Sequence, residues 1–165
     1  MEAKKQRRNS KLANRLNSTR VFFSLSYKIK ILLILCFALM GIVRLIIIFI
    51  PFRFIASRIG EKMSESPPEV DGNAQAKAAK IGWAISKMSR ITPWESKCLV
   101  QALTAQIILK FLNIPYTLYL GLDRDESSKL IAHAWLRCGN LVVTGGREKH
   151  RFVTVMQFAG SSKNT

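Results

Sequence analysis

The sequence predicts an α+β fold, in which a central helix packs on a small antiparallel sheet behind a hydrophobic helical arm. Three observations predict it. A long apolar run occupies residues 29–60, an apolar helical pattern occupies 98–112, and strand-like segments follow between residues 116 and 158. Apolar runs at helical spacing favour helices, whereas short segments rich in aromatic and β-branched residues favour strands.

Composition divides the chain into successive segments. Residues 1–28 are basic and rich in Ser and Asn, and we expect a flexible N-terminus there. Residues 29–60 form the hydrophobic arm, which contacts a membrane or a partner. Residues 61–76 contain two prolines and several acids, which is typical of a linker. Residues 77–165 then form the domain that carries the chemistry.

The hydrophobic arm allows three placements. From Ile31 to Ile50 the chain has twenty residues with one charge, Arg44, and such a run could span a bilayer. A helix bent at Pro51 could instead lie in the membrane interface, or it could pack on the domain or a partner protein. Basic residues flank both ends, so the positive-inside rule gives no orientation.

The charge of the chain is strongly positive. It has 26 Lys and Arg against 10 Asp and Glu, for a net charge of +16, and half of that excess lies in residues 1–30. Such an imbalance favours an anionic partner. A basic segment beside an apolar helix suits an anionic membrane, and no nucleic-acid-binding motif accompanies the charge, so we expect no nucleic-acid partner.

Cys98 is the candidate nucleophile. Residues 92–95 read Thr-Pro-Trp-Glu, a capping-box pattern, and Ser96 is a second possible N-cap, so Cys98 falls in the first turns of a helix that Asn113 ends. The positive helix end and its unpaired N–H groups favour the reactive thiolate and could bind an oxyanion. The alternative is a small buried core cysteine.

A histidine lies in the strand region that follows. We expect a strand at 116–122, a polar loop at 123–128, a hairpin of 130–138 with 141–144 around Gly139-Asn140, and a last strand at 152–158.

In this register Thr144 lies opposite Trp135 and diagonal to His133. His133 is either a catalytic base or a structural histidine bonded to a backbone carbonyl. The other histidine, His150, is expected to be solvated.

The remaining cysteines favour neither a disulfide framework nor a metal centre. Cys36 and Cys138 are widely spaced from Cys98 and have no base near them in sequence, so we expect packing residues. A zinc site needs about four closely spaced ligands, which this chain does not offer. We therefore expect no metal and no cofactor.

Three motifs carry a family resemblance. Trp94-x-x-x-Cys98-Leu-x-x-Ala-Leu, Asn113-Ile-Pro before a strand, and Ala132-His-Ala-Trp together resemble the transglutaminase-like cysteine peptidases. More narrowly, the chain is similar to the stand-alone B2 leader peptidases of lasso-peptide biosynthesis. The resemblance covers about residues 81–146 and extends to the end of the hydrophobic arm. It implies a papain/transglutaminase-like core.

The resemblance also implies an activity. Cys98 matches the nucleophile and His133 the general base of peptidases that remove the leader from a ribosomally made precursor peptide through a thioester. It further implies a small leader-recognition protein and an ATP-dependent macrolactam cyclase as partners. The odd count of widely spaced cysteines favours a reducing compartment, so we expect the catalytic side on the cytoplasmic side of the membrane. A catalytically inert, membrane-associated scaffold of a peptide-maturation complex is the alternative.

The chain departs from the family at the third catalytic position. Relatives carry an aspartate about a dozen residues after the histidine, where this chain reads Thr-Gly-Gly at 144–146. We expect Thr144 to orient the imidazole instead, and a backbone carbonyl, Asp123 or Asp125 are the other candidates. A dyad of Cys98 and His133 alone is also open.

Overall fold

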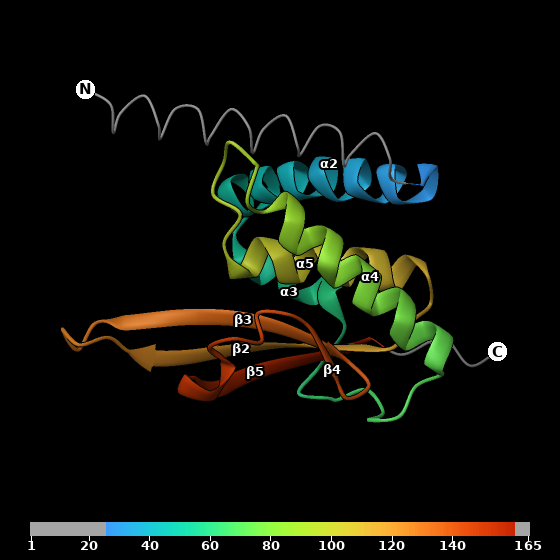
Figure 1. Ribbon diagram of the computed structural model, residues 1–165. Coiled ribbons are helices and arrows are strands. Elements are labelled where there is room, and N and C mark those ends of the chain that lie inside the picture. The colour runs from blue at the N-terminus through green and yellow to red at the C-terminus, as the bar shows by residue number, and fades with distance from the viewer. Residues whose placement is uncertain (1–25, 161–165) are drawn as a thin grey trace, which may run out of the picture.

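The computed structural model describes residues 26–160, in which a layer of helices covers one face of a five-stranded antiparallel sheet (Figure 1). The fold is therefore α+β, as the sequence predicts. The helices are α2 (Tyr27–Phe49), α3 (Phe52–Ile59), α4 (Gly72–Met88) and α5 (Cys98–Phe111). The strands are β1 (Glu61–Lys62), β2 (Tyr116–Arg124), β3 (Leu130–Cys138), β4 (Leu141–Thr144) and β5 (Val153–Gly160). Of the basic segment 1–28, where we expect a flexible N-terminus, residues 1–25 lie outside the described residues, and residues 27–28 belong to α2.

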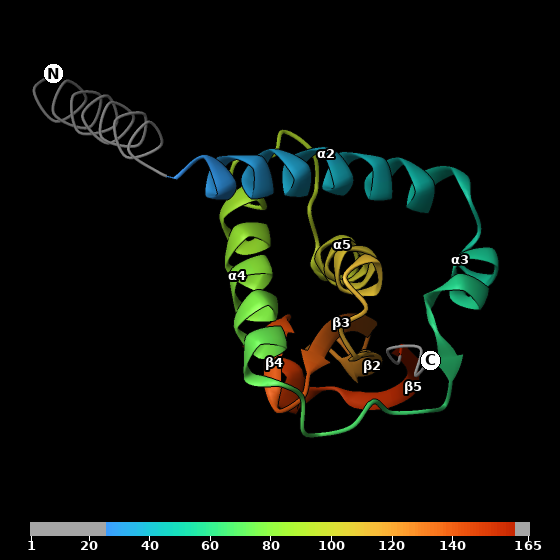
Figure 2. The ribbon, with the colours of Figure 1, turned by 90° about the vertical axis from the view of Figure 1, so that its right-hand side faces the viewer.

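The hydrophobic arm is two helices broken at Pro51, and α2 packs on the domain along one stripe. Leu33, Cys36, Met40 and Val43 recur at helical spacing and are all buried. They face α4 and α5, which run beneath α2 (Figure 2). Among the described residues, α2 is the one helix long and apolar enough to cross a membrane.

The opposite face of α2 is exposed. It carries large apolar side chains along its whole length, namely Tyr27, Ile31, Ile34, Leu35, Ile42, Leu45, Ile48 and Phe49. The domain accordingly covers one side of α2 and leaves the other side uncovered. Of the three placements, packing on the domain describes the covered side only.

The next helix begins earlier than the sequence pattern indicates. The division by composition places residues 61–76 in a linker, but α4 already starts at Gly72. The Asp71 carboxylate caps it by accepting hydrogen bonds from the backbone N–H groups of Asn73 (3.1 Å) and Ala74 (3.2 Å). The segment expected as a linker thus ends inside a helix. It also contributes β1, which pairs with β5 through Glu61 and Ala159.

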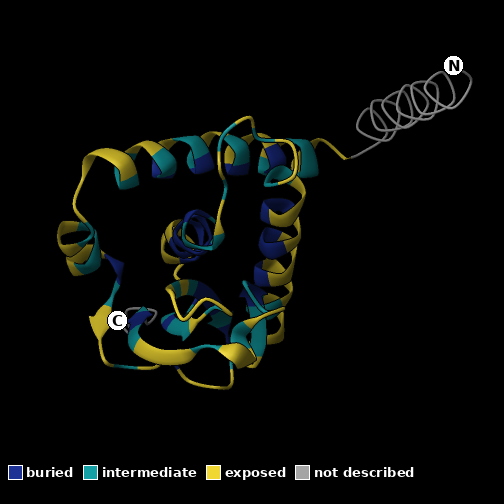
Figure 3. Ribbon diagram, turned by 90° about the vertical axis from the view of Figure 1, so that its left-hand side faces the viewer, coloured by how far each residue is buried: buried dark blue, intermediate teal, exposed yellow. Residues whose placement is uncertain are grey.

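α5 is the central helix of the layer. It lies between α2, α4 and the sheet, and Figure 3 shows it mostly buried. Its sequence is apolar almost all round, which predicts this position. The sheet beneath it has the order β1-β5-β2-β3-β4, so β3 lies between the long strand β2 and the short strand β4.

The predicted hairpin is present, but its register changes along the strands. Cys138 pairs with Leu141 as expected, whereas Thr144 lies opposite Leu136 and not opposite Trp135. The cause is a β-bulge on β4, in which Val143 is the extra residue. Val143 is buried and packs on α4 at Gly82, where any side chain would meet the Val143 carbonyl at 2.4 Å.

Candidate active site

Cys98 is the first residue of α5. The preceding residue, Lys97, occupies the N-cap position and makes no side-chain capping bond, so the first-turn N–H groups are not capped by a side chain. The expected capping box at 92–95 is therefore wrong, and Ser96 does not cap the helix either. The Ser96 and Thr92 hydroxyls bond each other at 2.7 Å, in the loop before α5.

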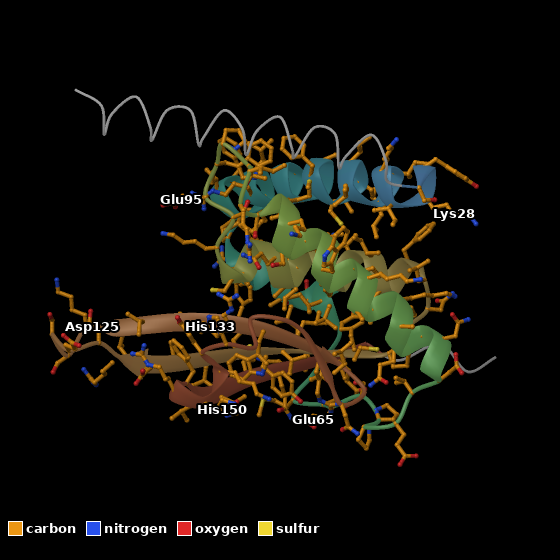
Figure 4. All side chains as sticks on the ribbon, in the orientation of Figure 1. Lys28, Glu65, Glu95, Asp125, His133 and His150 are labelled. Carbon is orange, nitrogen blue, oxygen red and sulfur yellow. The ribbon has the colours of Figure 1, made fainter. Side chains whose placement is uncertain are left out.

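That loop is held in place by α2. The Trp94 ring lies 5.0 Å from the Phe37 ring, centroid to centroid, and a Cβ at Gly41 would sit 3.2 Å from Trp94. Arg44 forms an ion pair with Glu95 at 3.3 Å, and Figure 4 shows Glu95 close to α2. The hydrophobic arm therefore fixes the segment that leads into the nucleophile. The arm and the Trp94–Cys98 motif are thus in direct contact.

His133 is held on three sides. Its Nε2 lies 2.8 Å from the carbonyl oxygen of Gly145, and its ring stacks against Phe152 at 4.9 Å and Trp135 at 6.0 Å. A carbonyl can only accept a hydrogen bond, so Nε2 carries the proton and donates it. In the neutral ring this leaves Nδ1 as the proton acceptor, which is the state that a general base requires.

The Gly145 carbonyl can reach His133 because residue 145 is glycine. Gly145 has φ +72°, and a Cβ there would lie 2.4 Å from the Ala134 carbonyl oxygen and 2.8 Å from the Trp135 Cβ. Only glycine tolerates both the left-handed backbone and the contact. Gly121 pairs with His133 across the β2–β3 ladder and leaves room for the Trp135 ring, since a Cβ at Gly121 would lie 2.8 Å from that ring.

The other candidate orienting groups make no hydrogen bond to His133. Thr144 is 7% exposed, and its hydroxyl has no hydrogen-bond partner in the described part of the chain. Asp123 pairs with Arg151 at 3.4 Å, and Asp125 accepts the N–H groups of its own turn. Of the alternatives open from the sequence, the backbone carbonyl is the one bonded to the imidazole, and orientation by Thr144 stays a prediction.

Cys98 and His133 line the same pocket, which has a volume of 650 Å³. β4 pairs with β3 only from Leu136 to Cys138, so the edge of β3 beside His133 is open, and the pocket forms there. Thr144 and Gly145 also line it. Across the described residues no hydrogen bond joins Cys98 to His133.

The charged side chains that line the pocket are mainly cations. Arg90, Lys97 and Arg147 line it, against a single acid, Glu148. Lys97 is paired with Glu95 at 3.3 Å, whereas no ion pair engages Arg90 or Arg147 within the described residues. The surroundings of Cys98 therefore favour a substrate segment that carries negative charge.

The remaining candidate residues lie outside the pocket. Cys36 and Cys138 are fully buried free thiols, and burial raises the pKa of Cys36 to about 11. Burial also raises the pKa of Cys138, although the positive charge of Arg137 opposes that effect. His150 is exposed in the short helix Lys149–Arg151. No cluster of three metal-ligating side chains occurs within residues 26–160.

Comparison with known protein families shows the superfamily of the chain. The model of the transglutaminase-like superfamily matches residues 46–157, which includes α3, both catalytic candidates and the end of α2. The chain belongs to the transglutaminase-like superfamily. No curated protein and no solved structure matches it. This superfamily typically uses a cysteine in catalysis, in peptidases and transferases, and Cys98 lies at the start of the central helix.

Sequence reasoning missed the network that supports the transglutaminase-like site from behind. Arg137 donates to the Tyr119 hydroxyl at 2.7 Å and pairs with Glu65 at 2.9 Å, and Tyr119 stacks on Trp135 at 5.4 Å. Trp135 in turn stacks on His133. The network ties the segment before α4 to the ring that flanks the imidazole. Its one visible signal was the alternation that places His133, Trp135 and Arg137 on one face of β3.

Proposed function

We propose that this chain is a cysteine peptidase that removes the leader segment from a ribosomally synthesised lasso precursor peptide. One observation carries the proposal. Within a transglutaminase-like fold, Cys98 at a helix N-terminus and His133 with its Nε2 proton donated to Gly145 line one pocket. The resemblance of the 94–103 and 132–135 motifs to leader peptidases supports the choice of substrate.

The reaction follows from these positions. Nδ1 of His133 takes the proton from the Cys98 Sγ, and the thiolate attacks the carbonyl carbon of the scissile amide. Uncapped N–H groups at the start of α5 stabilise the resulting oxyanion. The C–N bond then breaks, the imidazolium protonates the departing amine of the core peptide, and the leader remains as a thioester on Cys98. Water, deprotonated by His133, hydrolyses the thioester and frees the leader and the thiol.

A carbonyl in place of the family carboxylate alters one part of this chemistry. The Gly145 oxygen fixes the tautomer and the ring orientation, as a carboxylate would. It carries only a partial charge, so it stabilises the imidazolium less. A cysteine nucleophile tolerates this loss better than a serine, because a thiol gives up its proton more readily than a hydroxyl.

The proposed partners come from the family resemblance. A small leader-recognition protein presents the precursor, and an ATP-dependent cyclase closes the macrolactam on the amine that cleavage frees. The free cations at the pocket, Arg90 and Arg147, support an acidic segment of the precursor near the scissile bond.

We further propose that the chain lies on the cytoplasmic face of a membrane through residues 29–60. The exposed apolar face of α2 supports this position. The buried stripe and the Arg44–Glu95 pair hold α2 against the domain along its length, so a lying helix fits better than a spanning one. A spanning α2 would draw those contacts and part of the domain into the bilayer.

A catalytically inert scaffold is the second candidate, because no hydrogen bond joins Cys98 to His133 in the described chain. The deciding experiment is mass spectrometry of the precursor after incubation with the chain and the leader-recognition protein. Wild type is compared with Cys98→Ala. Leader release by wild type alone supports the peptidase, whereas an uncleaved precursor bound to folded wild type supports the scaffold.

A further inference from the structure

A second cavity lies away from the catalytic pocket, between α2, α3 and the C-terminal half of α5. Its volume is 490 Å³, within the range of small-molecule sites. The elements that enclose it surround α5 on one side in Figure 2. Its apolar lining comprises Val43, Ile46, Ile50, Phe54, Ile55, Ile59, Leu103, Ile107 and Phe111. We call this cavity the apolar groove.

Two cations border the apolar groove. Arg58 and Lys110 line it, and no Asp or Glu of the described chain does. The Lys110 ammonium donates to the Arg58 backbone carbonyl at 3.0 Å, which holds the ammonium close to Arg58. The Arg58 guanidinium has no ion-pair partner among residues 26–160. The groove thus combines an apolar interior with an uncompensated positive border.

The apolar interior of the groove offers few hydrogen-bond partners to a peptide backbone. Its polar uncharged side chain, Gln106, already donates to the Ile59 carbonyl at 3.0 Å and to the Tyr116 hydroxyl at 2.8 Å. A peptide placed in that interior would leave most of its N–H and C=O groups without partners, which is costly in an apolar site. A hydrocarbon chain needs no such partners.

The groove also continues the exposed face of α2. Phe49 and Phe111 are 77% and 84% exposed, and Ile50, Phe54 and Ile107 on the groove itself are exposed as well. The exposed apolar side chains of α2 therefore extend through Phe49 and Ile50 to the groove, where Phe54, Ile107 and Phe111 are exposed. A membrane on which α2 lies would meet the groove there.

We propose that the apolar groove binds an acyl chain of an anionic phospholipid, with the phosphate between Arg58 and Lys110. The proposal rests on the membrane position given above and is independent of the peptidase activity. It goes beyond attachment, because attachment by α2 alone needs only apolar insertion, whereas this site selects an anionic headgroup. The groove borders α5 from Leu103 to Phe111, roughly 8–20 Å along that helix from Cys98. It shares no lining residue with the catalytic pocket, so a bound lipid leaves that pocket open.

The test uses the full chain with two kinds of vesicle, phosphatidylcholine alone and phosphatidylcholine mixed with phosphatidylglycerol. The phosphatidylglycerol carries a photoreactive group on one acyl chain, and mass spectrometry maps the labelled residues. The double variant Arg58→Gln/Lys110→Gln is compared with Lys77→Gln/Lys80→Gln, which removes the same charge from the exposed surface of α4. Thermal unfolding checks that both variants are folded.

We expect labelling of Ile107 and Phe111, and a loss of roughly 30-fold in affinity for the mixed vesicles in the groove variant only. Its affinity for phosphatidylcholine vesicles should not change. Labels confined to the outer face of α2, or equal losses of vesicle affinity in both double variants, would refute lipid binding in the groove. Either result would still agree with the membrane position of α2. Loss of binding to the leader-recognition protein in the groove variant, without labelling, would assign the groove to that protein.

Discussion

Replacing Gly145 by alanine tests how the imidazole is held. The new Cβ would lie 2.4 Å from the Ala134 carbonyl oxygen, and Cβ atoms in proteins essentially never approach closer than 3.0 Å. The backbone at 145 must therefore shift by at least about 0.6 Å, and its carbonyl moves away from His133. A misplacement of about 1 Å in catalytic geometry costs roughly 100-fold, so we expect kcat to fall by about 10- to 100-fold.

The matched control is one residue further along the chain. Gly146→Ala places its Cβ 3.1 Å from a Val142 methyl group, which is a side chain that can adjust, so kcat should stay near wild type. Gly145→Ala, unlike this control, puts an alanine at φ +72°, which should also lower the free energy of unfolding by about 1–2 kcal/mol. The assay is leader release from the precursor, with kcat and KM determined separately.

KM should remain near wild type for Gly145→Ala, because the carbonyl acts on the base and not on substrate binding. Nitrogen NMR of the histidine ring gives a second readout, since the protonated nitrogen should no longer be Nε2 alone. A folded Gly145→Ala protein with wild-type kcat and an unchanged tautomer would refute the assignment of the carbonyl as the orienting group.

The remaining predictions concern single side chains. Thr144→Val should keep kcat within about threefold of wild type, and a loss on the order of 100-fold would instead support orientation by the Thr144 hydroxyl. Alkylation of the folded protein near neutral pH should modify Cys98 first, because Cys36 and Cys138 are fully buried; peptide mapping after iodoacetamide treatment checks this, and equal modification would contradict it. The Cys36 thiol has a raised pKa of about 11 in the folded state, so its stabilising contribution is complete below pH 9 and is lost as the pH rises toward 11. That loss amounts to about 3 kcal/mol, and urea unfolding of wild type and Cys36→Ala across this range should show a steeper decline for wild type. Trp94→Ala should lower the free energy of unfolding by roughly 3 kcal/mol and reduce leader release, since it separates the loop before Cys98 from α2; unchanged activity would show that α2 does not position the nucleophile.

The elements that depend on local chemistry could be predicted from the sequence. Pro51 lacks an N–H group and ends α2, and Gly139, with φ +56°, makes the hairpin turn expected between residues 138 and 141. The apolar periodicity of 98–112 predicted the buried central helix. In each case neighbouring residues alone dictate the conformation.

The features that depend on contacts between distant parts of the chain could not be predicted from the sequence. The pattern at 92–95 matches a capping box, but Trp94 packs on Phe37 and Glu95 pairs with Arg44, so tertiary contacts override the local preference. The position of Thr144 was wrong by one residue because Val143 bulges to pack against Gly82. The start of α4 was also missed, although its cap, Asp71, is a local signal.

The candidate site shows the same division. Residue type and spacing point to Cys98 and His133, and the structure places both on one pocket. The partner of His133 is a main-chain oxygen, which no side-chain pattern encodes. Gly145 was its one signal in the sequence, and the reason for that glycine is the close approach to the Ala134 carbonyl.

The central claim is that Cys98 carries the leader as a thioester. The most direct measurement is intact-protein mass spectrometry of an acid-quenched reaction of the chain, the leader-recognition protein and the precursor, followed by peptide mapping. The account predicts an added mass equal to the leader acyl group on Cys98 of wild type, and neither this adduct nor free leader with Cys98→Ala. An adduct on Cys36 or Cys138, or leader release by Cys98→Ala, would contradict it.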